Sequence, residues 1–380
     1  MDRVHRFEFV GAGSSKFWEI SHRGPEVIVR FGRIGTNGQT QTKELGSETA
    51  AAFHVAKLIK EKLAKGYVAV AGKGPGTAKT PSGADDFQTG ITRPPTSPPY
   101  EVPTLPRDGP FDIEGIRLPT GRRLDGNPSM APPGIEMITA PVVWVTDASV
   151  AECGHLLYRL REPLAKTGLT PVLLASMEAD DTRPWDSRAL SPTDPRRVDY
   201  FDVDQVLADM WRESVNEEDE GSLAPIEPFG LDFPGLAAAP VIKAPSAFGR
   251  LFSQVSDPSD DRPQLSSLPP RRIGIVAANR AADVITALGW IGGANVHQDP
   301  ALMSAVLRSW EDRWAARVIE IGFDTLTLTV GIPPRDRQTA LALAAEHFAF
   351  CPDNIWQGAD TLVAYAESIQ GRRHWAFWWD

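Results

Sequence analysis

The sequence predicts an α+β protein of 380 residues, with two folded parts joined by a proline-rich linker. β-Branched runs separated by glycine turns fill the first 72 residues, which indicates a small antiparallel β-sheet plus one helix. Of the 33 prolines, 13 fall between Gly72 and Gly134, and so many prolines cannot fill a helix or a central strand. From about residue 135, strand and helix patterns alternate, as in a larger mixed-sheet α/β domain. We therefore expect domains at 1–72 and 135–380, with a linker at 73–134.

The N-terminal elements are clearest between residues 26 and 46, EVIVRFGRIGTNGQTQTKELG. The run 27–29 is typical of a strand, glycines at three-residue spacing interrupt it, and the stretch 40–42 resumes it. This pattern predicts a strand, a tight turn and a returning strand. A helix begins near Ser47 and has an apolar side at positions 55, 58, 59 and 63.

Two irregular regions follow. The stretch TRPPTSPPYEVPTLP at 92–106 predicts an extended or polyproline II tether. A second region runs from about 214 to 270, between the acidic NEEDE at 216–220 and the sequence SSLPPRR. We expect it to be a long surface insertion in the C-terminal domain, disordered in part.

Apolar runs and helical periodicity define the elements of the C-terminal domain. Strands are predicted at 141–146, 171–174, 273–277, 317–321, 325–330 and 374–379. Helices are predicted at 149–166, 203–214, 279–289, 300–314, 337–349 and 359–369. Strands and helices that alternate in this way favour a mixed sheet.

Charge is unevenly distributed along the chain. Residues 1–72 hold 11 Lys+Arg against 7 Asp+Glu, a net charge of +4, whereas the remaining residues hold 28 against 42, a net charge of −14. A basic region in an acidic protein attracts polyanions locally. The whole-chain charge of −10 argues against indiscriminate coating of nucleic acid. We therefore expect modest, salt-sensitive binding that is confined to the N-terminal domain.

The residues that would contact nucleic acid lie on the predicted strands and turn. Arginine and lysine neutralise phosphates, an aromatic ring stacks on a base or ribose, and an amide hydrogen-bonds to either. Glycines let the backbone approach closely. The candidate residues are Arg30, Phe31, Gly32, Arg33, Gly35, Gln39 and Lys43.

Several blocks of the N-terminal sequence resemble the WGR domain, which is named for a Trp-Gly-Arg signature. The blocks are FWEI at 17–20, VRFGRIGTNGQ at 29–39, TKELGS at 42–47 and LIKEKLAKGY at 58–67. The resemblance covers roughly residues 3–72 and implies a domain that often binds DNA or RNA, strand ends included. Phe31 replaces the signature tryptophan, which keeps the aromatic ring but removes the indole donor. The rest of the chain does not resemble the catalytic domain of poly(ADP-ribose) polymerases, in which WGR domains also occur.

The C-terminal block from PPRDRQTALALAAEHFAF to the end resembles the bacterial family called domain of unknown function 4253. GLTPVLL at 168–174 and RPWD at 183–186 agree with that family, so the resemblance covers roughly 135–380. It implies no reaction, ligand or partner.

One group of residues in this block has the chemistry of a catalytic site. His347 and Cys351 are four residues apart and share a helix face, with Asp353 nearby. A histidine can activate a cysteine nucleophile, and His, Cys and carboxylate ligands can hold zinc. The alternative is a buried, structural cysteine, which is the common case for a lone cysteine on an apolar helix face.

Two classes of function remain open. We favour a bacterial nucleic-acid-binding protein, DNA-binding in first place and non-enzymatic or regulatory, whose C-terminal domain binds a protein or a ligand. The alternatives are an enzyme that uses the His347, Cys351 and Asp353 group, or a toxin-neutralising immunity-type protein. We expect no cofactor, no metal and no membrane segment, and the two cysteines suit a reducing cytoplasm.

Overall fold

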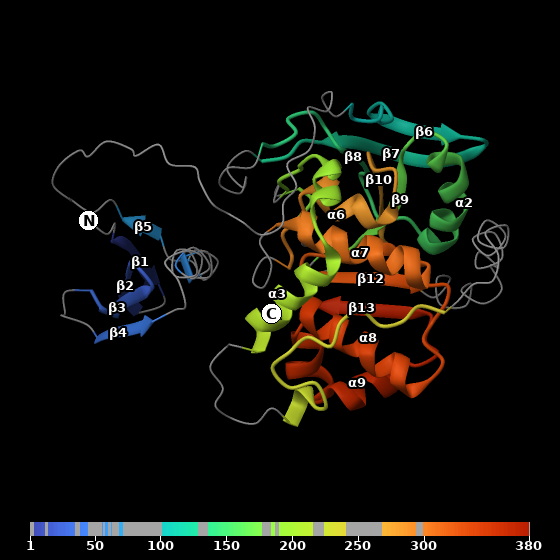
Figure 1. Cartoon of the computed structure of the whole chain (residues 1–380). Coiled ribbons are helices and arrows are strands. Elements are labelled where there is room, and N and C mark those ends of the chain that lie inside the picture. Colours follow the sequence, from blue (N-terminus) through green and yellow to red (C-terminus); the bar gives the residue numbers. More distant parts are fainter. Residues whose placement is uncertain are drawn as a thin grey trace. The chain divides into compact units, whose positions relative to one another are not determined.

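The computed structural model describes residues 4–11, 14–34, 39–44, 55, 58–59, 62, 68–70, 101–127, 136–176, 184–186, 190–215, 224–240, 268–293 and 299–379 (Figure 1). The chain divides into two compact units, 1–87 and 88–380. The first contains a small antiparallel sheet and the second a larger mixed sheet with helices, so the predicted α+β class is confirmed.

The first unit is a five-stranded antiparallel sheet with the strand order β4-β3-β2-β1-β5. Its strands are β1 (His5–Gly11), β2 (Ser14–Arg23), β3 (Glu26–Arg33), β4 (Gln39–Glu44) and β5 (Val68–Val70). A helical segment that contains Val55, Leu58 and Ile59 covers one face. The side chains beneath it are Phe7, Trp18, Ile20 and Val27, as the alternation of strand residues requires.

The second unit is built on an eight-stranded sheet with the order β13-β12-β11-β9-β10-β8-β7-β6. Its strands are β6 (Gly109–Ile113), β7 (Ile116–Leu124), β8 (Val143–Thr146), β9 (Thr170–Leu174), β10 (Arg272–Val276), β11 (Ala316–Ile321), β12 (Thr325–Val330) and β13 (His374–Trp378). Among the strands that the structure describes, β9 and β11 pair in parallel and the other neighbours pair antiparallel. The ladder of β6 and β7 lies inside the segment predicted as a linker, so that prediction is wrong from Gly109 to Leu124. Residues 73–100 and 128–134 of the predicted linker lie outside the described residues.

Helices cover both faces of this sheet. They are α2 (Cys153–Ala165), α3 (Val203–Val215), α6 (Val284–Leu288), α7 (Pro300–Trp314), α8 (Arg337–Phe350) and α9 (Leu362–Ile369), with short 3₁₀ turns η2 (Pro195–Tyr200), η3 (Ala224–Ile226) and η4 (Ala281–Asp283). α2 packs on one face, where it meets Leu173 of β9. The other helices share the opposite face, to which Val172 and Leu174 contribute. Neighbouring residues of one strand therefore belong to different cores.

Part of the predicted surface insertion is packed into the second core. The described residues 224–240 form an extended segment with little regular structure, yet Ile226 and Ala237 are buried. Phe229 and Phe233 contact the buried ring of Trp211 on α3. Most of the segment's other described residues are exposed or half-buried, so this stretch is a surface segment that tertiary contacts anchor to the core. Residues 216–223 and 241–267 lie outside the described part.

Glu346 on α8 fixes that segment in place. Its carboxylate is fully buried and accepts hydrogen bonds from the backbone N–H of Ala237 at 2.7 Å, from Trp310 Nε1 at 2.8 Å and from Arg313 Nη1 at 2.9 Å. Arg313 also donates to the carbonyl oxygen of Ala237 at 2.9 Å. A buried carboxylate is tolerated when a counter-charge and hydrogen bonds replace its water, and both are present here.

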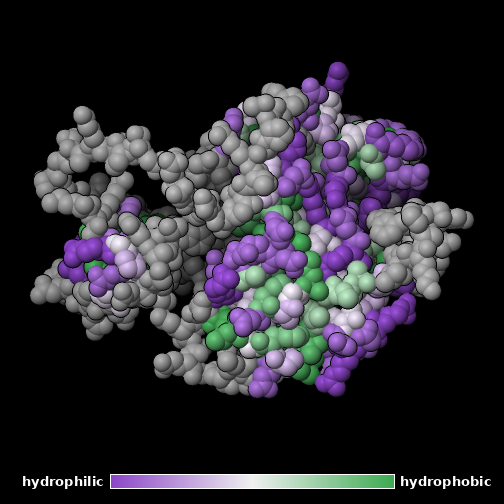
Figure 2. Space-filling view, in the orientation of Figure 1, coloured by the Kyte–Doolittle hydropathy of each residue, from purple (hydrophilic) through white to green (hydrophobic). Residues whose placement is uncertain are grey.

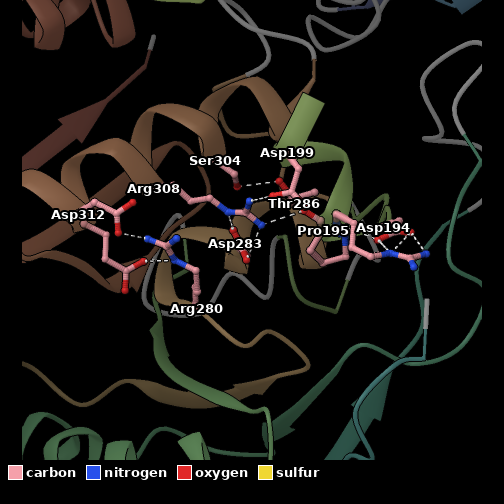
Figure 3. A network of polar contacts seen from close by, with 11 residues as sticks. Asp194, Pro195, Asp199, Arg280, Asp283, Thr286, Ser304, Arg308 and Asp312 are labelled. Carbon is pink, nitrogen blue, oxygen red and sulfur yellow. Dashed lines mark hydrogen bonds and ion pairs between the residues drawn. The ribbon is translucent and has the colours of Figure 1, made fainter. Parts of the chain in front are cut away.

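A second polar network positions α7 (Figure 3). Arg308 of α7 forms an ion pair with Asp283 of η4 and donates to the carbonyl oxygen of Pro195. Thr286 hydrogen-bonds to Ser304 at 2.7 Å in the buried space between α6 and α7. Because Asp283 is only 4% exposed, burial raises the pKa of its carboxyl, and Arg308 counteracts that effect. The network holds α7 against η2, η4 and α6.

Replacing Glu346 with alanine should destabilise the second unit by about 3 to 5 kcal/mol, since the half-buried Arg313 would lose its carboxylate partner and the buried N–H of Trp310 would lose its acceptor. Urea unfolding of the full chain, followed by circular dichroism, measures this change. Glu367→Gln is the matched control, because that carboxylate is exposed and lies 3.5 Å from Arg337. We expect the control to change stability by less than about 0.5 kcal/mol. An equal effect of both variants would contradict the assigned role of Glu346.

Candidate functional site

The face of the first sheet opposite Trp18 carries an ion-pair network on an aromatic ring. Phe17 is only 2% exposed, because two guanidinium groups cover it. The Cζ atoms of Arg6 and Arg30 lie 4.8 Å and 5.0 Å from its ring centroid. Glu19 joins the two arginines, accepting from Arg30 Nε at 2.7 Å and from Arg6 Nη1. Strand register explains the grouping, since Arg6, Glu19 and Arg30 are cross-strand neighbours.

Charges in this network are balanced. The hydrogen bond from Arg30, with a second from Arg6, holds the pKa of Glu19 below its ordinary value. Hydrogen bonds to Glu8 and Glu19 raise the pKa of Arg6, and the bond to Glu19 raises that of Arg30. Two arginines and two glutamates carry no net charge together. The network therefore orders this face more than it adds positive potential.

Phe31 lies on the other face of the sheet. It is half-buried and packs against the core that contains Trp18, its partner in the β2–β3 register. The ammonium of Lys62 lies 5.5 Å from the Trp18 ring centroid on the same side. Arg30 and Phe31 are consecutive in β3, so alternation separates their side chains across the sheet.

The structure places the other predicted residues by strand register. Gly32 is opposite Phe17, and Arg33 is opposite Lys16. Gln39 is opposite Phe31, and Lys43 is opposite Val27. Arg30 and Gly32 therefore occupy positions on the Phe17 face, while the positions of Phe31, Arg33, Gln39 and Lys43 belong to the Trp18 face. The side chains of Arg33, Gln39 and Lys43, and all of Gly35, lie outside the described part of the structure.

Sequence reasoning missed the contribution of Arg6, Phe17 and Glu19. A signal was present, because Glu19 interrupts the apolar run FWEI at 17–20, and the two-residue period of a strand places it on the same face as Phe17. The ion pairs of Glu19 with Arg6 and Arg30 could not be predicted, because they depend on the register of three strands, which the sequence does not reveal.

The second predicted group lies in the core of the larger unit. His347 is fully buried, with ring centroids of Trp375 at 4.5 Å, Trp310 at 4.7 Å and Phe377 at 5.0 Å from its own. Its Nδ1 is 3.1 Å from the hydroxyl of Tyr365. Burial, with a smaller effect of Arg313, holds the pKa of His347 well below its usual value. The imidazole is therefore neutral at physiological pH.

Cys351 does not pair with His347 through its side chain. Its thiol donates to the carbonyl oxygen of Trp378 at 3.0 Å, and burial raises its pKa. Its backbone N–H caps α8 by bonding to the His347 carbonyl oxygen at 2.8 Å. Asp353 is half-exposed and accepts from Gln357 at 3.0 Å. A nucleophilic thiol needs a nearby base or cation to lower its pKa, and this environment acts in the opposite direction.

Instead, these residues belong to a buried hydrogen-bonded chain that closes the end of α8. Asn354 donates to the Tyr365 hydroxyl at 3.1 Å and to the carbonyl oxygen of Ala376 at 2.8 Å. The Tyr365 hydroxyl is also hydrogen-bonded to His347 Nδ1 at 3.1 Å, so the chain runs from Ala376 through Asn354 and Tyr365 to the imidazole. Among the described residues, no three His, Cys, Asp or Glu side chains group as metal ligands would. Nor does any described helix have the length and apolarity needed to cross a bilayer.

Both cysteine side chains are buried, so we expect both thiols of the native chain to react at least about 100-fold more slowly with a maleimide than in urea. Mass spectrometry after brief labelling measures each site separately. Cys153 is an internal control, because burial raises the pKa of its thiol too. Rapid native labelling of Cys351 alone would restore the catalytic interpretation.

Comparison with known proteins finds one family match in each of the two units. The WGR domain family matches residues 1–74, and the family described as Domain of unknown function (DUF4253) matches residues 272–380. Two Escherichia coli proteins are similar over short stretches: YfeS is 39% identical over 62 residues, 16% of this chain and 25% of its own length. YehF is 38% identical over 65 residues, 17% of this chain and 24% of its own. The chain thus spans about a quarter of the length of these relatives.

A solved structure is also similar in sequence. The crystal structure of a Bacteroides fragilis protein is 45% identical to this chain, covering 18% of it and 20% of the other chain, with a TM-score of 0.18. The second family match begins at Arg272, whereas the sequence resemblance predicts that it begins near residue 135. The matched residues form β10 to β13 and α6 to α9. Because β10 lies between β8 and β9, the matched region shares one sheet with earlier strands. The chain therefore carries a WGR domain at residues 1–74 and a DUF4253 domain at residues 272–380.

Proposed function

We propose that this protein binds nucleic acid, DNA in first place, through its WGR domain, and that it acts without catalysis as a regulatory or anchoring protein. The net charge of +4 over residues 1–72 supports this proposal. The second unit, which is acidic, would bind a protein or a ligand while the first holds the protein on DNA.

The observation that carries the proposal is the register between Lys16 of β2 and Arg33 of β3. These cations occupy directly opposed positions, where two like charges destabilise a sheet. A phosphate at this pair of positions would attract two cations that would otherwise repel each other. Arg33 is also the arginine of the family signature, and the WGR family is generally associated with nucleic acids.

The Phe17 face is a less suitable place for a phosphate. Arg6 and Arg30 already donate to Glu19, so a phosphate there would compete with an existing carboxylate. Arg30 therefore has an orienting role in this proposal, and Arg33 with Lys16 forms the anion-binding pair. Phe31, on the Arg33 side by alternation, is the ring nearest in sequence that can contact a terminal base.

Replacing Arg33 with alanine should weaken the binding of a fluorescein-labelled DNA duplex with a 5′ phosphate by about 5- to 30-fold, because one phosphate contact is lost. Anisotropy titrations of the full chain at low and moderate salt measure this change. The slope of log K against log salt should fall by about 1.

Arg117→Ala is the matched control, because it removes an exposed arginine from β7 of the second unit. We expect it to leave the affinity unchanged. Arg30→Ala should have a smaller effect than Arg33→Ala, since Arg30 is already paired with Glu19. Absence of DNA binding at low salt, or equal losses in all three variants, would refute the proposal.

A further inference from the structure

Two large apolar side chains are exposed on neighbouring segments of the larger unit, among the residues that the structure describes. Trp356 is 42% exposed and Leu231 is 61% exposed. Both residues adjoin one buried pair of rings: Trp356 packs on Phe348, Phe348 packs on Trp211, and Trp211 Nε1 donates to the carbonyl oxygen of Leu231. In Figure 2, hydrophobic residues lie among hydrophilic ones around α3 and α8. We call this the Trp356–Leu231 surface.

An unusual backbone presents Trp356 to solvent. Asn354–Ala359 (η5) form a π-helical turn, and Asp360, which follows it, has a φ of 65°. Both features are rare for ordinary residues and cluster at functional sites. The buried side chain of Asn354 holds the turn in place by hydrogen bonds to the carbonyl oxygen of Ala376 and the hydroxyl of Tyr365. The buried hydrogen bonds at the end of α8 therefore fix the backbone that carries the exposed Trp356.

The surroundings of these two side chains are acidic. Glu227 and Asp232 belong to the segment 224–240, which contains no Lys or Arg. Asp353 and Asp360 flank Trp356, and residues 351–370 contain no Lys or Arg either. Three of these four carboxylates are exposed and the fourth, that of Asp353, is half-exposed. This surface therefore repels nucleic acid and attracts a cation.

We propose that the Trp356–Leu231 surface docks a cationic segment of a partner protein. An apolar side chain of that segment would pack on Trp356 and Leu231, and its lysines or arginines would meet the carboxylates at the rim. A tryptophan at the centre with charges around it is the usual arrangement of a binding hot spot, in which the aromatic supplies affinity and the charges supply steering. The proposal gives the second unit a partner of defined chemistry and does not depend on DNA binding by the first.

A synthetic amphipathic peptide of leucine and lysine, labelled with fluorescein, is the probe, and an otherwise identical peptide with glutamate for lysine is its control. The full chain should bind the lysine peptide at least about tenfold more tightly than the glutamate peptide. Trp356→Ala should weaken that binding by about tenfold or more. Asp232→Asn combined with Asp360→Asn should weaken it about two- to fivefold and reduce its salt dependence.

Trp378→Ala is the matched control. That side chain is 37% exposed, but it lies on the face of β13 opposite the buried Trp375 and Phe377. It should leave peptide binding unchanged. Leu231→Ser provides a second test that does not threaten folding, because this side chain is largely exposed. All variants should bind 5′-phosphorylated DNA like the native chain, which separates this proposal from the proposed function.

Three outcomes would overturn the proposal. The first is that neither peptide binds the native chain, and the second is that Trp356→Ala and Leu231→Ser bind the lysine peptide normally. The third is sedimentation evidence of a dimer that Trp356→Ala dissociates, because a second copy would then occupy the surface.

Discussion

The second unit depends on the buried carboxylate of Glu346. A negative charge without water is unstable in a protein interior unless cations and donors surround it. Arg313, Trp310 and the backbone of Ala237 supply these partners, and they come from α7 and from the segment 224–240. One charge thereby specifies where two helices and an otherwise irregular segment meet. An apolar residue at this position would fill space without fixing the direction of any of them.

The burial of α8 explains why the chain turns sharply after this helix ends. From Leu343 to Cys351 every residue of α8 and its cap is buried, so the helix has no solvated side over this stretch. It must end where the sheet ends, and the Cys351 thiol bonds to the carbonyl oxygen of Trp378 in β13 at that point. The chain then has to leave the core, which places the π-helical turn and Trp356 at the surface. The histidine and cysteine that suggest catalysis in the sequence serve this closure.

Much of the fold can be predicted from sequence because burial leaves a periodic pattern. Helix 300–314 agrees at both ends, since Asp299 caps it and Pro300 starts it. The β6–β7 hairpin was missed because Pro110 and Pro119 looked like linker residues. β6 is an edge strand, and Pro119 lies in the part of β7 that does not pair with β8, so neither proline removes a needed hydrogen bond. The site was predicted less well, because a linear motif hides which side of the sheet each residue occupies.

Charge segregation links the two proposals without requiring the units to touch. A polyanion that binds the WGR domain is repelled by the remaining residues, with their net charge of −14, and a cationic partner is repelled by the domain with +4. Each ligand is therefore directed to one unit and kept from the other. Salt would weaken both kinds of attraction, but it would also weaken the repulsion that sorts the ligands. Under the two proposals, DNA and a basic protein would be held at once, because neither ligand would compete for the other's surface.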